Sequence, residues 1–442
     1  MKLPVCVREC MALLENAGHT CYAVGGCVRD WLLGLTPHDY DLCTDATPEQ
    51  MQRIFSGYQL VLAGEKHGTV GVVCGREVVE ITTFRTEGDY KDNRHPDSVR
   101  FVSRVEEDLA RRDFTVNAMA WSPSRGLVDP FGGARDLKNR QLRAVGDPEN
   151  RFREDSLRIL RGVRFSLRFR LMPDEDTLDA MLTLAPLMDN LARERVMDEL
   201  TRLLLLASAE DLLFYAPIIT QVIPELRPCV GFQQHNSHHI YDVYAHIAHV
   251  VENVPAQPAL RWAALLHDVG KPATFTLDED GKGHFYGHAA VSAELADGIL
   301  LRLKAPTALR AQVVTLIAQH MSHPIADKKF LRRRLSKLGA DTLEQLLALQ
   351  EADIGGKSPR SQKELAVFAQ SRVILSELLA ENSCLHIKDL AVNGHDLMAL
   401  GHSGRAIGDA LNHLLELVLD EKLPNRRQDL LNYLQNHFGG NL

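Results

Sequence analysis

The sequence contains no long apolar run. Its first ten residues have no apolar core of signal-peptide length, and no later stretch approaches the length of a membrane-spanning helix. These absences exclude a membrane partner, and we expect a cytoplasmic protein. Internal repeats and low-complexity tracts are also lacking, so the fold has to be inferred from local patterns and motifs.

Cysteine is scarce and is not arranged for metal binding. The chain has 8 cysteines, most of them before residue 75, and no two are separated by only two residues. Without that spacing a zinc knuckle is not predicted. The pattern favours buried thiols in a reducing compartment over disulfides.

Positive charge is not in excess over the whole chain. The formal net charge is -8, which disfavours general coating of nucleic acid. Between residues 85 and 170, however, 19 lysines and arginines stand against 14 aspartates and glutamates. A basic zone on an acidic protein predicts local contact with phosphate groups, although a solvated basic face gives the same pattern.

Length and composition indicate a soluble globular protein of two to four domains, with 442 residues, 45% hydrophobic and 24% charged. Residues 68–74 and 77–84 form strand-like runs around Gly75 and Arg76, which predicts a β-hairpin. After residue 147 helical patterns take over, as in 155–169 and 193–206. We predict an α+β domain over 1–147 and all-helical domains over 148–230, 231–356 and 357–442.

A glycine turn begins the most informative segment. Gly25 and Gly26 follow a short apolar run that ends at Val24, and two glycines let the backbone turn with positive φ and approach a ligand closely. The N–H groups of a helix that starts there suit a triphosphate, and Arg29 adds a cationic fork.

Two carboxylates follow this turn. On an extended strand Asp39 and Asp41 would leave the same face, and paired carboxylates beside phosphates suit Mg²⁺. The alternative without a function is a glycine turn followed by a solvated acidic loop. The order and close spacing of the two motifs favour a nucleotidyl-transfer site instead.

Further along the chain, Glu80 lies on the second strand of the predicted hairpin and would supply a third carboxylate that orients an attacking hydroxyl. The alternative for Glu80 is a solvated residue on the surface of the strand. Arg112, Asp113 and Asn117 supply a cation for phosphates, with an acceptor and an amide for a ribose hydroxyl. The alternative is a helix cap beside surface arginines.

Nucleotide selection is assigned to the segment that starts at Glu154. Asp155 and Arg158 are three residues apart, so on a helix they would be neighbours. An acceptor beside a donor fork matches the edge that cytosine and adenine share, whereas uracil and guanine present the reverse order. The alternative is a plain intrahelical ion pair.

Over residues 20–205 these motifs resemble, in identity, order and spacing, those of bacterial class II tRNA nucleotidyltransferases, the CCA-adding enzymes. The resemblance implies a polymerase-β-like nucleotidyltransferase head, a helical neck, and template-independent addition of C, C and A to the tRNA 3′ end. Residues 88–96 stand where that family has a mobile loop, and residues 193–199 resemble its neck motif.

The same resemblance implies roles for single residues. Gly26 and Arg29 would contact the triphosphate, and Asp39 and Asp41 would hold Mg²⁺. Arg112 and Asp113 would lie near phosphate and ribose. The residues that would meet the incoming nucleotide are Asp155, Arg158, Arg161 and Arg164.

A second group of residues resembles the HD phosphohydrolase superfamily, which some tRNA nucleotidyltransferases carry after the neck. Adjacent histidine and aspartate, joined by distant ones, can bind one or two divalent cations that activate water against a phosphate. His320 belongs to the pattern, while His235, His238 and His239 receive no role. The predicted metal ligands are His246, His267, Asp268, His288 and Asp353.

We therefore predict an Mg²⁺-dependent enzyme that extends tRNA with CTP and ATP and has an HD phosphohydrolase activity with a divalent metal of unspecified identity. One rival is a poly(A) polymerase or a partial A- or CC-adding enzyme, because these share head and neck. Another is an HD phosphohydrolase whose head only binds RNA. Asp39 and Asp41 argue against the latter, because a binding module needs no pair of carboxylates facing a phosphate.

Overall fold

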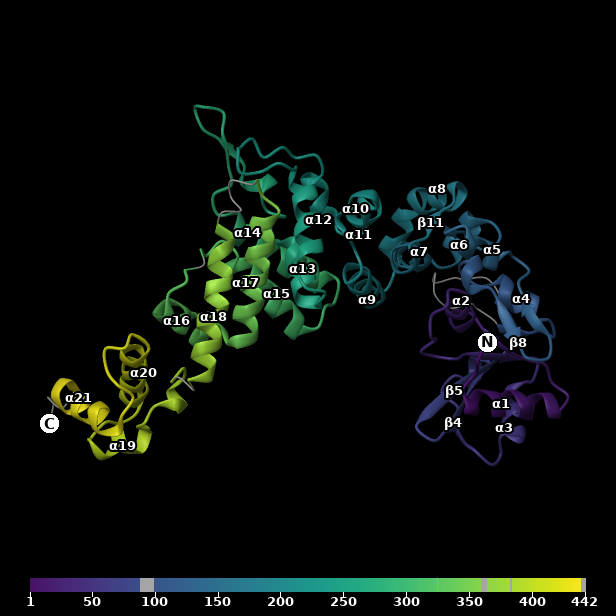
Figure 1. The fold of residues 1–442 in the computed structure, drawn as a ribbon, viewed down its shortest axis with the longest axis horizontal. Helices are drawn as coiled ribbons and strands as arrows, with labels where there is room; N and C mark the ends of the chain where they lie inside the picture. The colour runs from purple at the N-terminus through teal and green to yellow at the C-terminus, as the bar shows by residue number, and fades with distance from the viewer. Residues whose placement is uncertain (88–98, 324, 359–363, 382–383, 439–442) are drawn as a thin grey trace. The chain divides into compact units, whose positions relative to one another are not determined.

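The computed structural model describes residues 1–87, 99–323, 325–358, 364–381 and 384–438 (Figure 1). The predicted mobile loop at 88–96 lies outside these residues. The chain divides into two compact units, one of Met1–Ala207 with Phe214–Pro224 and one of Ser208–Leu213 with Glu225–Leu442. The four domain boundaries drawn from the sequence stay predictions. Within the described residues, the helices lack the combination of length and apolar character that crossing a membrane requires.

The first unit contains a mixed seven-stranded sheet with the strand order β3-β4-β5-β2-β1-β8-β9. Strands β2 and β5 are parallel, and the other neighbours in this sheet are antiparallel. The strands are β1 (Cys21–Val24), β2 (Leu42–Thr44), β3 (Gln59–Val61), β4 (Thr69–Cys74), β5 (Glu77–Thr83), β8 (Ala120–Ser122) and β9 (Gly126–Val128), with β6 (Arg85–Glu87), β7 (Val99–Phe101), β10 (Gln141–Leu142) and β11 (Met172–Pro173) in two small sheets.

The predicted hairpin is confirmed as β4 and β5, which pair with Cys74 opposite Glu77 around the turn at Gly75 and Arg76. Along β5 the side chains of Val79, Ile81 and Thr83 are buried and that of Glu80 is exposed, the alternation that the pleat of a strand imposes. The sheet therefore presents Glu80 on its solvent-facing side.

Helices alternate with the strands of the sheet along the chain, and helices predominate after residue 147. The prediction for 155–169 is confirmed as α7, which starts two residues later than expected, and that for 193–206 as α9. The helices of the first unit are α1 (Val5–Asn16), α2 (Gly26–Leu32), α3 (Pro48–Ile54), α4 (Val105–Ala110), α5 (Gly133–Lys138), α6 (Pro148–Glu154), α7 (Leu157–Phe169), α8 (Glu175–Thr183), α9 (Arg193–Leu204) and α11 (Ala216–Val222).

Among the described residues of the second unit, the regular structure is helical apart from the two-residue strands β12 (Thr276–Leu277) and β13 (Gly283–His284). Leu331, Leu343 and Phe368 belong to one apolar cluster, so α16, α17 and α18 share a core. The helices are α10 (Ala209–Phe214, whose last residue belongs to the first unit), α12 (Val243–Asn253), α13 (Pro258–Leu266), α14 (His288–Arg302), α15 (Thr307–Gln319), α16 (Lys328–Leu338), α17 (Ala340–Gly355), α18 (Ala366–Ala380), α19 (Gly394–Ala399), α20 (Arg405–Leu419) and α21 (Arg427–Phe438). The predicted fold class, an α+β head followed by helical regions, is confirmed.

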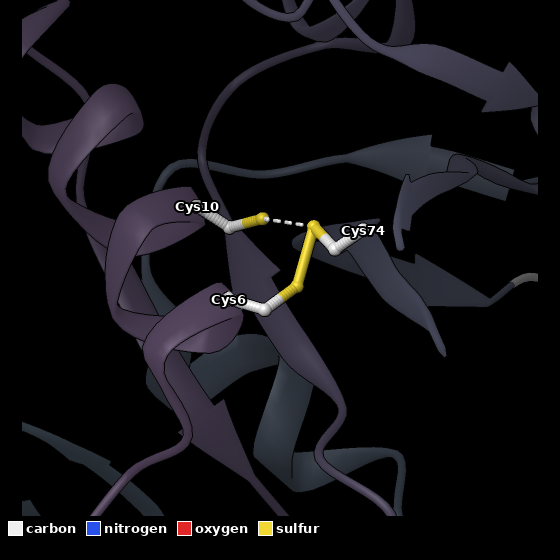
Figure 2. A group of neighbouring side chains, drawn as sticks. All are labelled: Cys6, Cys10 and Cys74. Atoms are coloured by element: carbon white, nitrogen blue, oxygen red, sulfur yellow. Dashed lines mark hydrogen bonds between the residues drawn. A yellow bond between two sulfur atoms is a disulfide. The ribbon is translucent and has the colours of Figure 1, made fainter. Parts of the chain in front are cut away.

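The cysteine prediction was wrong at one pair. Cys6 on α1 and Cys74 at the end of β4 form a disulfide (Figure 2). Cys10, Cys21 and Cys43 are buried thiols, as expected. The pair was missed because 68 residues separate its members, and only the packing of α1 beside the hairpin brings them together.

Candidate functional site

The glycine turn is built as the sequence predicts. Gly25 has φ of 75° between β1 and α2, and its N–H donates to the carbonyl of Met119 at 3.0 Å. A Cβ atom on Gly25 would lie 2.7 Å from Nη1 of Arg112. The guanidinium of Arg112 therefore lies directly against the turn, and a side chain at Gly25 would displace it.

Arg29, one turn into α2, is buried and held on several sides. Its Nε and Nη2 donate to Oδ1 of Asp30 at 2.9 and 2.7 Å, and Nη1 donates to Oδ1 of Asn117. Its guanidinium also lies 4.1 Å from the ring centre of Phe169. Burial lowers the pKa of Arg29. The predicted cationic fork thus exists, but its donors are engaged by the protein.

The two aspartates lie before β2 rather than on a strand, which corrects the prediction of one strand face. Asp39 and Asp41 are in the loop that leads into β2, and the carbonyl of Asp41 accepts from the N–H of Val24 on β1. Leu42 on β2 is paired in parallel with Ile81 on β5. One step earlier in this register, Asp41 aligns with Glu80, so the predicted third carboxylate lies beside Asp41.

The charges around Asp41 show which groups surround it. Partial burial raises the pKa of Asp41, Glu80 and Asp39 raise it further, and Arg112 opposes them. Like charges held close together favour a bound cation. Within the described residues these carboxylates are not among the groups of three ligand atoms that all lie within 4.8 Å of one another. A loose pair of carboxylates still suits Mg²⁺, because this ion takes one or two carboxylates and completes its shell with substrate phosphates and water.

Asp113 connects the turn to helix α7. It is buried, its Oδ2 accepts from Nη2 of Arg161 at 2.6 Å, and its Oδ1 accepts from Nδ2 of Asn117 at 3.0 Å. Burial alone would raise the pKa of Asp113, but Arg161 and Asn117 hold it well below its usual range. Because Asn117 also accepts from Arg29, one polar chain runs from α2 to α7.

The predicted selection residues have partners that the sequence did not suggest. Asp155 is not on a helix with Arg158, because it has extended backbone angles at the end of α6. Its carboxylate accepts from Nη2 of Arg195 at 2.9 Å. Arg158 is buried and donates to Glu154 at 2.5 Å. Neither the shared helix nor an ion pair between Asp155 and Arg158 is present.

Two further arginines of α7 lie beside an aromatic ring of the same helix. Arg161 and Arg164 lie 5.4 and 4.5 Å from the ring centre of Phe165. Nε of Arg164 donates to Oε2 of Glu199 on α9 at 2.6 Å, and both side chains are buried. Arg195 and Glu199, the partners of Asp155 and Arg164, both lie in the segment that resembles the family's neck motif.

In the second unit the predicted HD residues converge. Nε2 of His246 lies 3.0 Å from Oδ1 of Asp353 and 3.5 Å from Oδ2 of Asp268. Nε2 of His267 lies 3.2 Å from that Asp268 oxygen. The other oxygen of Asp268 lies 3.3 Å from Nε2 of His288 and 3.8 Å from Nε2 of His320. Two groups of ligand atoms therefore share Asp268.

Backbone contacts orient the four imidazole rings. The Nδ1 atoms of His267, His288 and His320 lie 2.7 to 2.8 Å from the carbonyls of Ala264, Phe285 and Ile317, and Nδ1 of His246 lies 3.3 Å from that of Gly356. A ring that donates through Nδ1 presents Nε2 as a metal ligand, the usual arrangement around a bound cation.

Several ligand atoms of this cluster are buried without a hydrogen-bond partner. They are Nε2 of His267, His288 and His320, and Oδ2 of Asp268. Burial lowers the pKa of His320 to about 4, which keeps its ring in the neutral form that binds metal. The donor set of imidazoles and carboxylates fits a divalent transition metal.

The cluster forms one side of a cavity of about 470 Å³. Nζ of Lys271 forms an ion pair with Oδ2 of Asp268 at 2.8 Å and donates its hydrogen bond to Oε1 of Gln234, while Lys357 donates to Asp353 at 2.7 Å. Sequence reasoning gave these lysines no role. Lys271 lies three residues after Asp268, so its position was a signal, whereas Lys357 is the first residue of the predicted C-terminal domain.

Family models match three parts of the chain. The model described as "Poly A polymerase head domain" matches residues 21–143, and "Probable RNA and SrmB- binding site of polymerase A" matches 170–229. The model "HD domain" matches residues 236–354. These matches fall on the candidate head site, the helices after it, and the histidine–aspartate cluster.

Relatives resemble the chain over nearly its whole length. The CCA-adding enzyme of Bacillus velezensis is 30% identical over 95% of both chains. That of Levilactobacillus brevis is 33% identical over 96% of both. That of Oceanobacillus iheyensis reaches 47% identity over 44% of this chain and 48% of its own.

Two solved structures of CCA-adding enzymes have the same fold as this chain. The Bacillus stearothermophilus CCA-adding enzyme in complex with CTP is 26% identical, with a TM-score of 0.76 over 99% of this chain and 98% of its own. The Thermotoga maritima CCA-adding enzyme complexed with tRNA is 21% identical and shares the fold, with a TM-score of 0.59 over 98% and 96%. The chain therefore belongs to the CCA-adding enzymes, nucleotidyltransferases that in this case carry an HD domain.

Proposed function

We propose that the first unit adds C, C and A to the 3′ end of tRNA, using CTP, ATP and a Mg²⁺ ion held by Asp39 and Asp41. One observation carries the proposal: Asp41 lies within the electrostatic reach of Asp39, Glu80 and Arg112, and Arg112 lies against the Gly25 turn. A metal-binding pair, a third carboxylate and a phosphate-binding cation thus belong to one site.

Each residue has a defined part in the proposed reaction, an in-line attack of the tRNA 3′-hydroxyl on the α-phosphate with loss of pyrophosphate. Arg112 and the backbone at Gly25 and Gly26 hold the triphosphate, and Glu80 orients the attacking hydroxyl. At the ribose hydroxyls, Asp113 accepts a hydrogen bond and Asn117 donates one. When bound, Mg²⁺ offsets the charge that develops on the phosphate oxygens.

Nucleotide selection is proposed for Asp155 and Arg158 in spite of their protein partners. A carboxylate has about four lone-pair sites and a guanidinium has five N–H donors. Asp155 accepts from Arg195 and from the N–H of Leu157, and Arg158 donates to Glu154 and to the carbonyls of Arg151 and Arg111, so both groups keep some unused capacity. Those partners would fix the acceptor and the donor in place beside the base. Arg161 and Arg164 are proposed to contact the incoming nucleotide from the same helix.

The metal and hydroxyl roles are testable by substitution. Asp39→Ala and Asp41→Ala should abolish nucleotide addition while tRNA binding, measured by filter retention, survives. Glu80→Ala should slow addition strongly. Glu77→Ala is its matched control, because Glu77 is an exposed glutamate on the same strand. Near-normal addition by either aspartate variant would refute the metal assignment.

The rivals differ from this proposal in their products. A poly(A) polymerase would extend RNA with ATP alone, and a partial enzyme would stop after one or two nucleotides. A head that only binds RNA would add nothing. Because tRNA, CTP and ATP are cytoplasmic substrates, the proposed reaction also belongs in the cytoplasm.

A second activity, metal-dependent phosphate-ester hydrolysis, is proposed for the HD domain. The buried, unpartnered Nε2 atoms that face Asp268 favour it, because such atoms are costly unless a cation occupies the space between them. His246, His267, Asp268, His288 and Asp353 would hold the metal, with His320 beside them. A bound cation supplies the activated water for attack on phosphorus.

This second activity can be measured with p-nitrophenyl phosphate and bis-p-nitrophenyl phosphate in the presence of Mn²⁺, Ni²⁺, Co²⁺ or Zn²⁺. The wild-type chain should release p-nitrophenol with at least one of these metals, and the His267→Ala/Asp268→Ala variant should not. Equal rates for both proteins would refute the assignment.

A further inference from the structure

Three cysteines gather outside both proposed sites, where helix α1 meets the end of the β4–β5 hairpin. Cys6 and Cys10 lie one turn apart on α1 and so share a face of the helix. Cys74 is the last residue of β4. The three sulfur atoms all lie within 4.8 Å of one another, and Figure 2 shows them pointing toward a common centre.

A disulfide accounts for only two of these sulfurs. Cys6 and Cys74 are joined, and Sγ of Cys10 lies 4.0 Å from Sγ of Cys74. Cys10 is completely buried, whereas Cys6 and Cys74 are partly accessible. A third sulfur is not needed for a structural link between helix and hairpin, yet the fold directs it at the other two.

The donor set defines the ligand that would fit. The group contains sulfur alone, with no imidazole or carboxylate among its members. Thiolates select soft cations such as Cu⁺ and Zn²⁺, whereas Mg²⁺, Ca²⁺ and Mn²⁺ prefer oxygen. Two of the ligands come from one helical turn and the third from the end of a strand, so all three belong to regular elements.

We propose that Cys6, Cys10 and Cys74 form a thiolate site for a soft cation, Cu⁺ or Zn²⁺, that becomes available when the Cys6–Cys74 disulfide is reduced. A dithiol reductant supplies two electrons and two protons, opens the sulfur–sulfur bond and itself becomes a disulfide. The cation then binds the three sulfurs and their thiol protons are released to solvent.

The test uses the full chain, reduced and kept without oxygen, and titrated separately with Cu⁺ and with Cd²⁺ as a probe for the Zn²⁺ type of site. Thiolate coordination produces a sulfur-to-metal absorption band in the ultraviolet. The HD cluster contains no sulfur and contributes nothing to that band. We expect the band to saturate at one cation per chain in one or both titrations, and to be absent before reduction.

Substitutions identify the ligands. Cys6→Ser, Cys10→Ser and Cys74→Ser should each weaken binding by more than the about 10- to 100-fold that loss of an outer-shell partner costs. Cys384→Ser, which alters a free cysteine of intermediate exposure elsewhere in the chain, should not. Circular dichroism and nucleotide addition would verify that each variant is folded.

Two results would overturn the proposal. One is the absence of a sulfur-to-metal band in the reduced wild-type protein with both cations. The other is unchanged affinity in folded Cys10→Ser, which would reduce the group to a disulfide with a buried neighbour. If Cys10→Ser fails to fold, Cys10→Ala provides the same comparison, because alanine also fits a buried position and also removes the sulfur.

Discussion

At the scale of single residues, Gly25 is the position where one added methyl group should act on the proposed phosphate-binding arginine. Its φ of 75° disfavours other residues, and a Cβ would lie 2.7 Å from Arg112. Gly25→Ala should therefore cost about 1 to 3 kcal/mol of backbone strain. By displacing a phosphate-binding cation, it should also slow nucleotide addition about 100-fold or more. Single-turnover addition to tRNA lacking its last three nucleotides measures this loss.

Gly18→Ala is the matched control. Gly18 has φ of 87°, but nothing lies within 4 Å of the position of its Cβ. The control should also carry the cost of a positive φ and should keep nucleotide addition. Equal loss of addition in both variants would mean that strain, and not the contact with Arg112, is responsible.

Asp155 offers a second test at this scale. Removing its carboxylate should weaken the use of CTP and ATP and narrow their advantage over UTP and GTP, because unpaired polar groups cost about 1 to 3 kcal/mol each. Competition among the four nucleotides measures the preference of Asp155→Ala. Asp198→Ala, which breaks an exposed ion pair with Arg202, is the control. A variant that keeps full preference for C and A would remove Asp155 from the selection role.

The residue identities of the candidate site could be predicted, but their partners could not. Motif spacing identified Asp155 and Arg158, yet the carboxylate of Asp155 is paired with Arg195, 40 residues away. Spacing along a helix predicts neighbours only if both residues are helical, and Asp155 lies between two helices. Pairing at long sequence separation depends on how α7 packs against α9, which no local pattern contains.

At the scale of elements, a buried ion pair between Arg164 on α7 and Glu199 on α9 joins the two helices. Removing one partner of a buried ion pair leaves an uncompensated charge. We expect Glu199→Gln to destabilise the first unit by about 3 kcal/mol. Urea unfolding, followed by the fluorescence of Trp31 and Trp121 in a Trp262→Phe background, measures the change.

The neighbouring residue supplies the comparison. Asp198 pairs with Arg202 on the exposed face of α9, and surface pairs are worth about 0 to 1 kcal/mol. Asp198→Asn should therefore leave the unfolding curve nearly unchanged. A loss as large as that of Glu199→Gln would show that the charge of α9, and not the buried pair, stabilises the contact with α7.

Elements with a clear period were predictable, and contacts between distant elements were not. The hairpin of β4 and β5 and helices α7 and α9 follow directly from alternation and helical spacing. The Cys6–Cys74 disulfide does not, because nothing local to α1 indicates that the end of β4 packs beside it. The parallel pairing of β2 with β5, which aligns Asp41 with Glu80, was equally invisible in the sequence.

At the scale of the whole molecule, the two sites belong to different compact units. His267→Ala with Asp268→Ala should therefore abolish phosphate-ester hydrolysis and leave nucleotide addition within about twofold of wild type, as expected for independent sites in separate compact units. Both activities should be measured on the same preparation. Loss of nucleotide addition from a folded double variant would show that the sites depend on each other.

The central claim, addition of C, C and A to tRNA, is tested most directly by the products made from tRNA that lacks its last three nucleotides. The wild-type chain with Mg²⁺ should add two nucleotides with labelled CTP alone, three with CTP and ATP together, and none with UTP or GTP. Addition should then stop. Long tails made from ATP alone, or no incorporation of any nucleotide, would contradict the account.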